Sequence, residues 1–433
     1  MAKRRRKADQ WAGEVREQNL NGMFAAMRDQ AQADMGDEIS IGVEAQSSLV
    51  GLPLPALSLR YLFQSTMLPL SRIIQIIGQE GSAKSAFLYE VFRWHMFYGG
   101  GAVLAENENK DSPELRHSLL MWNEEWINRL MVKKTHSLEE WQDVFTYFSK
   151  NMAKTMDAAD GPGRTFPFAI AVDSLMATAP QAEIEQVEKD GHAVRGYALA
   201  ANMIARYMRT MPRRIQDYPF TVIGTNHEKP GTDARGIPTS SVPGGKAVKF
   251  METYEIGMKK ASTGADIDKA EYQGLRVDMK ARKNSLGPSR KMITAELQWW
   301  MAEDASGEWR QHTAWDWHSA STEMLLKLEN VSGKKTLYNN IRDLLGLKPQ
   351  RSNRKCAATE IGLEDAVDYR TLAATLENHP DKLRQLYPML GITERYPFQP
   401  GVDYMSAKAA AAEHSQIVEG VTDAAAEAEE TDS

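Results

Sequence analysis

The chain has 433 residues, a formal net charge of -6 and a single cysteine, Cys356. This length allows one large domain with smaller additions, and one cysteine excludes an internal disulfide and a thiolate metal cluster. No stretch resembles a signal peptide or a membrane-spanning segment, so the sequence predicts a protein of a reducing compartment with no membrane partner.

The two ends of the chain carry opposite charges. Residues 3–7 are all Lys or Arg, whereas residues 411–433 hold seven carboxylates and no Lys or Arg. Two solvated, disordered ends would explain this pattern. The alternative is an acidic tail that competes with a polyanion for the basic surface of the protein.

The spacing of apolar residues predicts an α/β fold. A helix over 11–35 precedes a connection rich in Pro and Leu, and strands and helices then alternate. The predicted strands are 73–77, 101–105, 167–172 and 219–224, and the predicted helices are 84–98, 113–132, 138–153 and 195–215. Short strands follow at 252–260, 274–281 and 291–298, and helices resume from Ser321. Such alternation is typical of βαβ units, so we expect a mostly parallel central sheet.

Residues 73–90 read IIQIIGQEGSAKSAFLYE, which is typical of a strand, a phosphate-binding loop and a helix. Backbone N–H groups would face phosphate, Lys84 would add charge and Ser85 would be a Mg²⁺ ligand. The predicted nucleotide-binding residues are Gly78, Gln79, Glu80, Gly81, Ser82, Ala83, Lys84 and Ser85. Ala83 replaces the glycine of G-x-x-x-x-G-K-[ST], and a positive φ there would cost about 1–2 kcal/mol. We therefore predict a weakened motif that still binds nucleotide.

Three carboxylates end predicted strands near this loop. Asp173 closes the strand in FPFAIAVDS, a position from which a carboxylate holds Mg²⁺ through water, although it would also suit a turn cap. Glu106 and Glu108 follow the strand 101–105. Either could polarise an attacking water, and either could be a solvated loop carboxylate.

The helix predicted over 195–215 has a mostly basic stripe. Its members are Arg195, Asn202, Arg206, Arg209 and Arg213, and the opposite face carries Ile204, Tyr207, Met208 and Met211. Such a stripe would contact nucleic-acid phosphates, or it would simply be a solvated face. Pro212 favours an earlier end of the helix, which leaves Arg213 as the weakest member.

Three longer stretches, AVDSLMATAPQAEIE, TVIGTNHEKP and SSVPGGKAVKFMETYEIGMKK, resemble the core of RecA-type recombinases in order and spacing. The resemblance covers about residues 48–300. His227 after Asn226, and the missing glycine before Lys84, resemble the phage UvsX branch. The implied organisation is an N-terminal basic arm and subunit-packing helix (1–47), a RecA-like P-loop ATPase core (48–300), a small mainly helical C-terminal domain (301–410) and an acidic tail (411–433).

The resemblance also implies roles for the carboxylates and the histidine. Lys84 and Ser85 would hold the ATP phosphates and Mg²⁺, and Asp173 would hold a Mg²⁺ water. The family places a proline five residues after its catalytic glutamate, a spacing that favours Glu108 over Glu106. His227 would couple ATP to a DNA-binding loop over 228–243, and the position of the adenine-stacking aromatic falls at Leu115.

Three further groups of residues are predicted to contact DNA or a neighbouring subunit, and the second of them rests on the resemblance alone. Predicted DNA contacts are Arg195, Arg206, Arg209, Gly244, Gly245 and Lys246. Cations that would reach the ATP of a neighbouring subunit are Lys280, Arg282 and Lys283, with no choice among them. Lys334, Lys335, Arg351, Arg354 and Lys355 would form a duplex-DNA entry patch or a solvated surface.

The implied function is a DNA-dependent ATPase that uses ATP and Mg²⁺ to form a filament on single-stranded DNA. It would pair that strand with homologous double-stranded DNA and exchange strands, helped by an ssDNA-binding protein and a loading mediator. The expected location is the bacterial cytoplasm, in a phage-infected cell. The alternatives are a RecA-fold hexameric helicase-like or regulatory ATPase, and a nucleotide-holding ssDNA-binding protein.

Overall fold

The computed structural model describes residues 49–158, 166–175, 177–190, 197–232, 238–241, 245–303, 307–331, 347–349, 355–358, 363–368, 376–399, 402 and 404–411. Leu49–Lys408 forms one compact unit. Several predictions lie outside the described residues: the N-terminal arm and helix, the tail beyond Ala411, and Arg195, Gly244, Lys334, Lys335, Arg351 and Arg354. Among the described helices, none has the length and apolar character needed to span a membrane.

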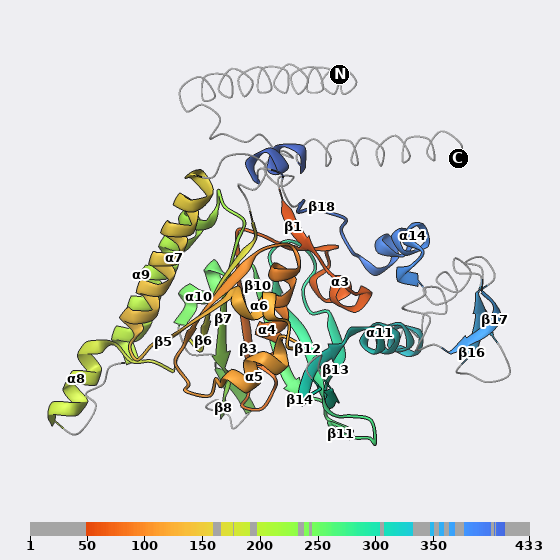
Figure 1. Cartoon of the computed structure of the whole chain (residues 1–433), viewed down its shortest axis with the longest axis horizontal. Helices are drawn as coiled ribbons and strands as arrows, with labels where there is room; N and C mark the ends of the chain where they lie inside the picture. Colours follow the sequence, from red (N-terminus) through yellow and green to blue (C-terminus); the bar gives the residue numbers. More distant parts are fainter. Residues whose placement is uncertain are drawn as a thin grey trace, which may run out of the picture. The chain divides into compact units, whose positions relative to one another are not determined.

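A central sheet of ten described strands forms the core (Figure 1). Its parallel part runs, in spatial order, through β10 (Tyr254–Lys260), β3 (Arg72–Gly78), β7 (Phe220–His227), β6 (Phe168–Asp173), β4 (Gly101–Glu106) and β5 (Leu130–Lys134). Antiparallel strands extend it beyond β10 through β12 (Gln273–Asn284), β13 (Met292–Glu303) and β14 (Trp309–Asp316), and β11 (Asp266–Asp268) pairs with β12. The predicted mostly parallel sheet is therefore confirmed.

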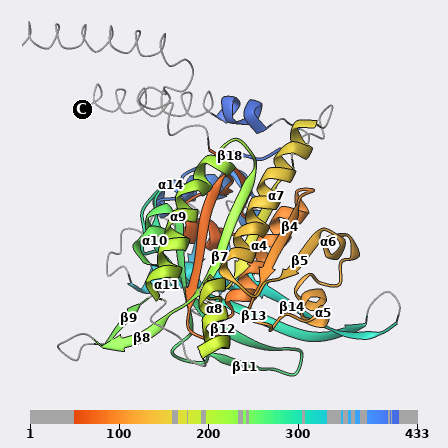
Figure 2. The ribbon, with the colours of Figure 1, turned by 90° about the vertical axis from the view of Figure 1, so that its left-hand side faces the viewer.

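Helices cover the parallel strands on both faces. The chain moves from β3 through α4 (Lys84–Phe97) to β4, and it returns through α7 (Leu138–Ala158), α9 (Tyr197–Ile215) and α10 (Gly245–Met251). Right-handed crossovers place these outward and returning helices on opposite faces. Figures 1 and 2 show α7 and α9 side by side on the face of the sheet opposite α4.

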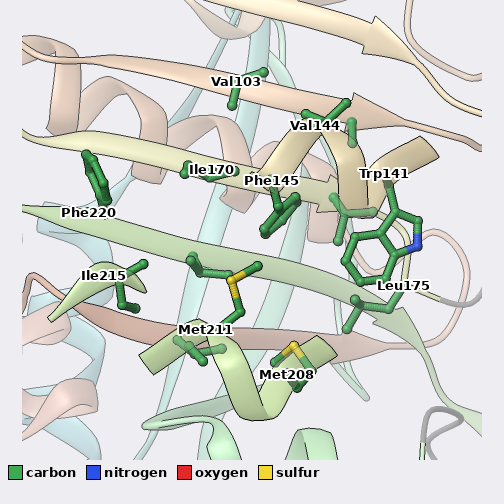
Figure 3. Close-up of a cluster of buried hydrophobic side chains, with 14 of the residues drawn as sticks. Val103, Trp141, Val144, Phe145, Ile170, Leu175, Met208, Met211, Ile215 and Phe220 are labelled. Carbon is green, nitrogen blue, oxygen red and sulfur yellow. The ribbon is translucent and has the colours of Figure 1, made fainter. Parts of the chain in front are cut away.

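A cluster of buried apolar side chains lies between the sheet and this helix pair (Figure 3). Trp141 and Phe145 of α7 and Met208 of α9 pack on Ile170 and Phe220 of the sheet. The rings of Trp141 and Phe145 meet edge to face with centroids 5.5 Å apart, an arrangement that aromatic pairs favour. Burial of these side chains explains why α7 and α9 keep one polar and one apolar face.

Smaller elements complete the described unit. Before β3, α3 (Leu57–Phe63) connects β1 (Val50–Pro53) to β2 (Met67–Pro69), and β1 pairs with β2 and with β18 (Tyr396–Pro397). Other helices of the described residues are α5 (Pro113–Leu119), α6 (Glu124–Asn128), α8 (Gln181–Asp190), α11 (Trp317–Val331) and α14 (Pro380–Leu390). Two further sheets consist of β8 (Lys229–Thr232) with β9 (Pro238–Ser241), and of β15 (Leu347–Pro349), β16 (Lys355–Ala358) and β17 (Leu363–Asp368).

The structure corrects three secondary-structure predictions. The helix predicted over 113–132 is wrong, because Met121 and Trp122 adopt positive φ after α5 and the chain then forms α6 and the edge strand β5. Pro212 does not end α9, which continues to Ile215. The predicted boundary between the core and the C-terminal domain, at residue 300, lies inside β13, so the central sheet extends past it. The residues after this boundary form strands as well as helices.

Candidate nucleotide-binding site

Four neighbouring parallel strands end at one edge of the sheet, and each ends in or next to a predicted site residue. Gly78 at the end of β3 pairs with His227 at the end of β7, and Glu106 at the end of β4 pairs with Asp173 at the end of β6. Ligands of open α/β sheets bind outside such carboxyl ends. The register therefore brings the predicted residues together.

The loop that the sequence predicts to bind phosphate joins β3 to α4. Lys84 is buried, and its Nζ donates to the carbonyl oxygens of Gly78 at 3.1 Å and Gln79 at 2.8 Å. A side chain at Gly78 would lie 2.3 Å from the carbonyl oxygen of Met258, so the close packing of β3 on β10 requires glycine. Burial lowers the pKa of Lys84, and the nearby Asp173 and Glu108 carboxylates oppose that shift.

Ala83 adopts the left-handed conformation, with φ 62° and ψ 28°, immediately before α4. Replacing it with glycine is expected to raise the free energy of unfolding by up to about 1 kcal/mol, since relief of strain exceeds the added entropy of the unfolded chain. Urea denaturation measures this difference. Ala86→Gly is the matched control inside α4, where glycine costs about 0.5–1 kcal/mol. Equal destabilisation by both changes would contradict strain at Ala83.

Asp173 lies next to the first turn of α4. Its Oδ2 accepts a hydrogen bond from the Ser85 hydroxyl at 2.6 Å, and its Oδ1 accepts one from Thr225. Burial raises the pKa of the Asp173 carboxyl, and these two hydrogen bonds oppose the shift. A hydroxyl and a carboxylate are hard oxygen donors that suit Mg²⁺, which commonly takes its other ligands from water and substrate phosphate. Among the described residues, no three or more His, Cys, Asp or Glu side chains are arranged so that they could hold a metal ion by themselves.

Glu108 lies at the centre of a charged cluster above the loop. Its Oε1 is 2.6 Å from Nε2 of His227, and its Oε2 is 3.1 Å from Nζ of Lys110. Burial alone would raise the pKa of Glu108, but the nearby Ser174 hydroxyl, His227 and Lys110 together lower it to about 2. The carboxylate is therefore ionised at neutral pH, as a general base must be.

The structure separates the two glutamates that the sequence left as alternatives. Oε1 of Glu106 accepts a hydrogen bond from the backbone N–H of Lys110 at 3.1 Å, and Glu106 is buried. It therefore holds the shape of the loop after β4. Glu108, in contrast, contacts two cationic or ionisable side chains. Leu115, at the predicted base-stacking position, lies on α5 and is exposed.

Sequence reasoning did not identify Asn107, Lys110 or Thr225. The side chain of Asn107 forms two hydrogen bonds with the backbone of Ser174: its Oδ1 accepts one from the Ser174 N–H at 2.6 Å, and its Nδ2 donates one to the Ser174 carbonyl at 2.8 Å. These bonds tie the end of β4 to the end of β6. The placement of Asn107 and Lys110 on either side of Glu108 was the available signal.

The three predicted trans-acting cations have different surroundings. Arg282 forms two hydrogen bonds of 2.8 Å with the carboxylate of Glu228, immediately after β7. Lys283 donates to backbone carbonyls at the C-terminal end of α10, where a cation is favourable. Lys280 is exposed, and within the described ranges its side chain has no hydrogen bond or ion pair.

The described part of the predicted basic stripe lies on the open face of α9. Asn202, Arg206, Arg209 and Arg213 are exposed, whereas Ile204, Met208 and Met211 are buried against the core. Arg206 and Arg209 have no ion-pair partner in the part of the chain that the structure describes. Gly245 and Lys246 lie in the first turn of α10, and the predicted loop 228–243 includes β8 and β9.

Comparison with known proteins gives distant relatives, among them several that are named RecA. The chain is 22% identical over 259 residues to "Protein RecA" of Fusobacterium nucleatum, covering 60% of this chain and 62% of that protein. It is 24% identical over 265 residues to "Protein RecA" of Clostridium novyi (61% and 67%), and 26% identical over 268 residues to that of an Arthrobacter species (61% and 69%). No protein-family model matches the chain.

Proposed function

We propose that this chain, as a distant member of the RecA family, is a DNA-dependent ATPase that forms a filament on single-stranded DNA and exchanges strands with homologous duplex. One observation carries the proposal: Lys84, Ser85, Asp173 and the Glu108–His227 pair meet at one edge of a parallel sheet. The similarity to proteins named RecA agrees with it.

Each site residue has a different role in the proposed hydrolysis of ATP. Glu108 takes a proton from water, whose oxygen attacks the terminal phosphorus while the bond to the bridging oxygen breaks, giving ADP and phosphate. Lys84 and the N–H groups of the loop stabilise the charge that collects on the phosphate oxygens. Ser85 and Asp173 would hold a Mg²⁺ ion, which neutralises phosphate charge when bound.

His227 is the proposed link between ATP and DNA. Its ring contacts Glu108, and the next residue, Glu228, forms the ion pair with Arg282 where the chain leaves β7 for the β8–β9 hairpin. A terminal phosphate that changes the Glu108–His227 contact would therefore act on the start of the predicted DNA loop.

Self-assembly is supported by an apolar groove beside the edge strand β5. The groove has a volume of about 560 Å³, and its lining includes Met131 of β5 and Val144, Tyr147 and Phe148 of α7. We propose the N-terminal helix of a neighbouring copy as its occupant, because residues 11–35 carry apolar side chains at helical spacing. Lys280 is the preferred trans-acting cation, since Arg282 and Lys283 would first have to leave their present partners.

The double variant Arg206→Ala, Arg209→Ala is expected to bind single-stranded DNA more weakly than the parent. If each contacts one phosphate, the slope of log K against log salt falls in magnitude by about 1.4. A titration of labelled oligonucleotide at several salt concentrations measures that slope. The double variant Lys150→Ala, Lys154→Ala on α7 loses the same charge elsewhere, and an equal change in its slope would contradict a specific contact.

The function as a whole is tested by the steady-state rate of ATP hydrolysis with Mg²⁺, with and without single-stranded DNA. Strong stimulation by DNA, together with helical filaments in electron micrographs, is the expected result. Closed hexamers would favour a helicase-like motor, and nucleotide binding without hydrolysis would favour the ssDNA-binding alternative. The phage-infected bacterial cytoplasm, the loading mediator and the competing acidic tail stay predictions.

A further inference from the structure

Lys110 connects the phosphate-binding loop to the predicted catalytic base. Its Nζ lies 3.2 Å from Oε1 of Glu80 and 3.1 Å from Oε2 of Glu108. The backbone N–H of Lys110 is held by Glu106, whereas its side chain is 59% exposed. The main chain of Lys110 is therefore fixed, while its ammonium group can move between the phosphate-binding loop and Glu108.

The charges around Lys110 favour a phosphate ligand. Lys110 and Lys84 are close enough for the charge of Lys110 to lower the pKa of Lys84. The carboxylates that act on the charge of Lys84 are those of Asp173, Glu108 and Glu80. The contact with Glu80 joins two exposed side chains, and such pairs contribute little. A triphosphate carries more charge than any one of these carboxylates and would compete successfully for the ammonium.

The same contact restricts the proposed base. Oε1 of Glu108 is engaged by His227 and Oε2 by Lys110, so both carboxylate oxygens have a partner. A general base must lie within hydrogen-bond reach of the proton that it takes, either directly or through one water. Withdrawal of Lys110 would open Oε2 to the attacking water while His227 kept the carboxylate oriented.

We infer that Lys110 is a further phosphate-contacting residue of this site: its ammonium leaves Glu108 for the terminal phosphate of ATP, and the exchange frees the base. The inference rests on the proposed ATPase function. It requires Lys110 to distinguish ATP from ADP, because ADP lacks the terminal phosphate that Lys110 contacts.

The test compares three variants by displacement of a fluorescent nucleotide with ADP and with a non-hydrolysable ATP analogue. Lys110→Ala is expected to weaken binding of the analogue about tenfold or more, with little effect on ADP, and to lower kcat. Glu80→Gln removes a competing partner and is expected to tighten binding of the analogue. Lys134→Ala is the matched control, because Lys134 is exposed nearby but donates to Asn109.

Two results would overturn the inference about Lys110 without affecting the proposed ATPase function. One is an unchanged ratio of ATP-analogue to ADP affinity in Lys110→Ala, measured in a parent that hydrolyses ATP. The other is a loss of affinity for the ATP analogue in Glu80→Gln equal to that in Lys110→Ala, which would mean that Lys110 only holds Glu80 and Glu108 in place. A parent protein that neither binds nor hydrolyses ATP would instead overturn the proposed function, and the inference with it.

Discussion

Replacing Glu108 with glutamine is expected to lower the rate of ATP hydrolysis by about 100-fold to 10,000-fold while ATP still binds. Glutamine keeps the size of the side chain but cannot accept the proton of the attacking water. The measurement is steady-state hydrolysis at saturating ATP, together with equilibrium binding of a non-hydrolysable analogue. With a pKa of about 2, Glu108 loses its proton at strongly acidic pH, so protonation of this group does not limit the rate above about pH 4.

Glu106→Gln is the matched control for this experiment. The oxygen of glutamine can still accept the hydrogen bond from the Lys110 N–H, so the loop after β4 should keep its shape. Hydrolysis in this variant is expected to stay close to that of the parent. A large loss in Glu106→Gln with little loss in Glu108→Gln would reverse the assignment of the base.

Replacing Lys84 with alanine is expected to weaken ATP binding by about 100-fold and to abolish hydrolysis, because the buried charge facing the phosphates is lost. Two loop carbonyls now hold the ammonium in place, so it needs little rearrangement to meet a ligand. Isothermal titration calorimetry measures the affinity. Thermal unfolding without nucleotide is the control, and ATP affinity equal to that of the parent in a folded variant would place the nucleotide elsewhere.

Local patterns predicted the elements that build the site to within a few residues. The strand predicted over 73–77 and the helix over 84–98 are β3 (Arg72–Gly78) and α4 (Lys84–Phe97), because an apolar run, a small-residue loop and a helical pattern follow one another directly. The positive φ anticipated for Ala83 is also observed. Each of these features depends on neighbours in the sequence.

Elements at the margin of the sheet were harder to predict. β5 is an exposed edge strand whose pairing with β4 compensates for a weak apolar pattern, and its residues were assigned to a helix. Pro212 was expected to favour an earlier end of α9, but burial of Met208, Met211 and Ile215 against the core outweighs the missing hydrogen-bond donor. Tertiary packing decided both outcomes.

The sequence by itself determined the alternation of β3, α4 and β4, the loop predicted to bind phosphate and the described part of the basic stripe of α9, since these follow from the spacing of nearby residues. Only the tertiary structure decided that Glu108 meets His227, 119 positions away, and that Glu106 supports the loop. It likewise brought Lys110 between Glu80 and Glu108. The Glu108–His227 contact depends on the order and register of parallel strands, because residues distant in the chain become neighbours only where those strands end side by side.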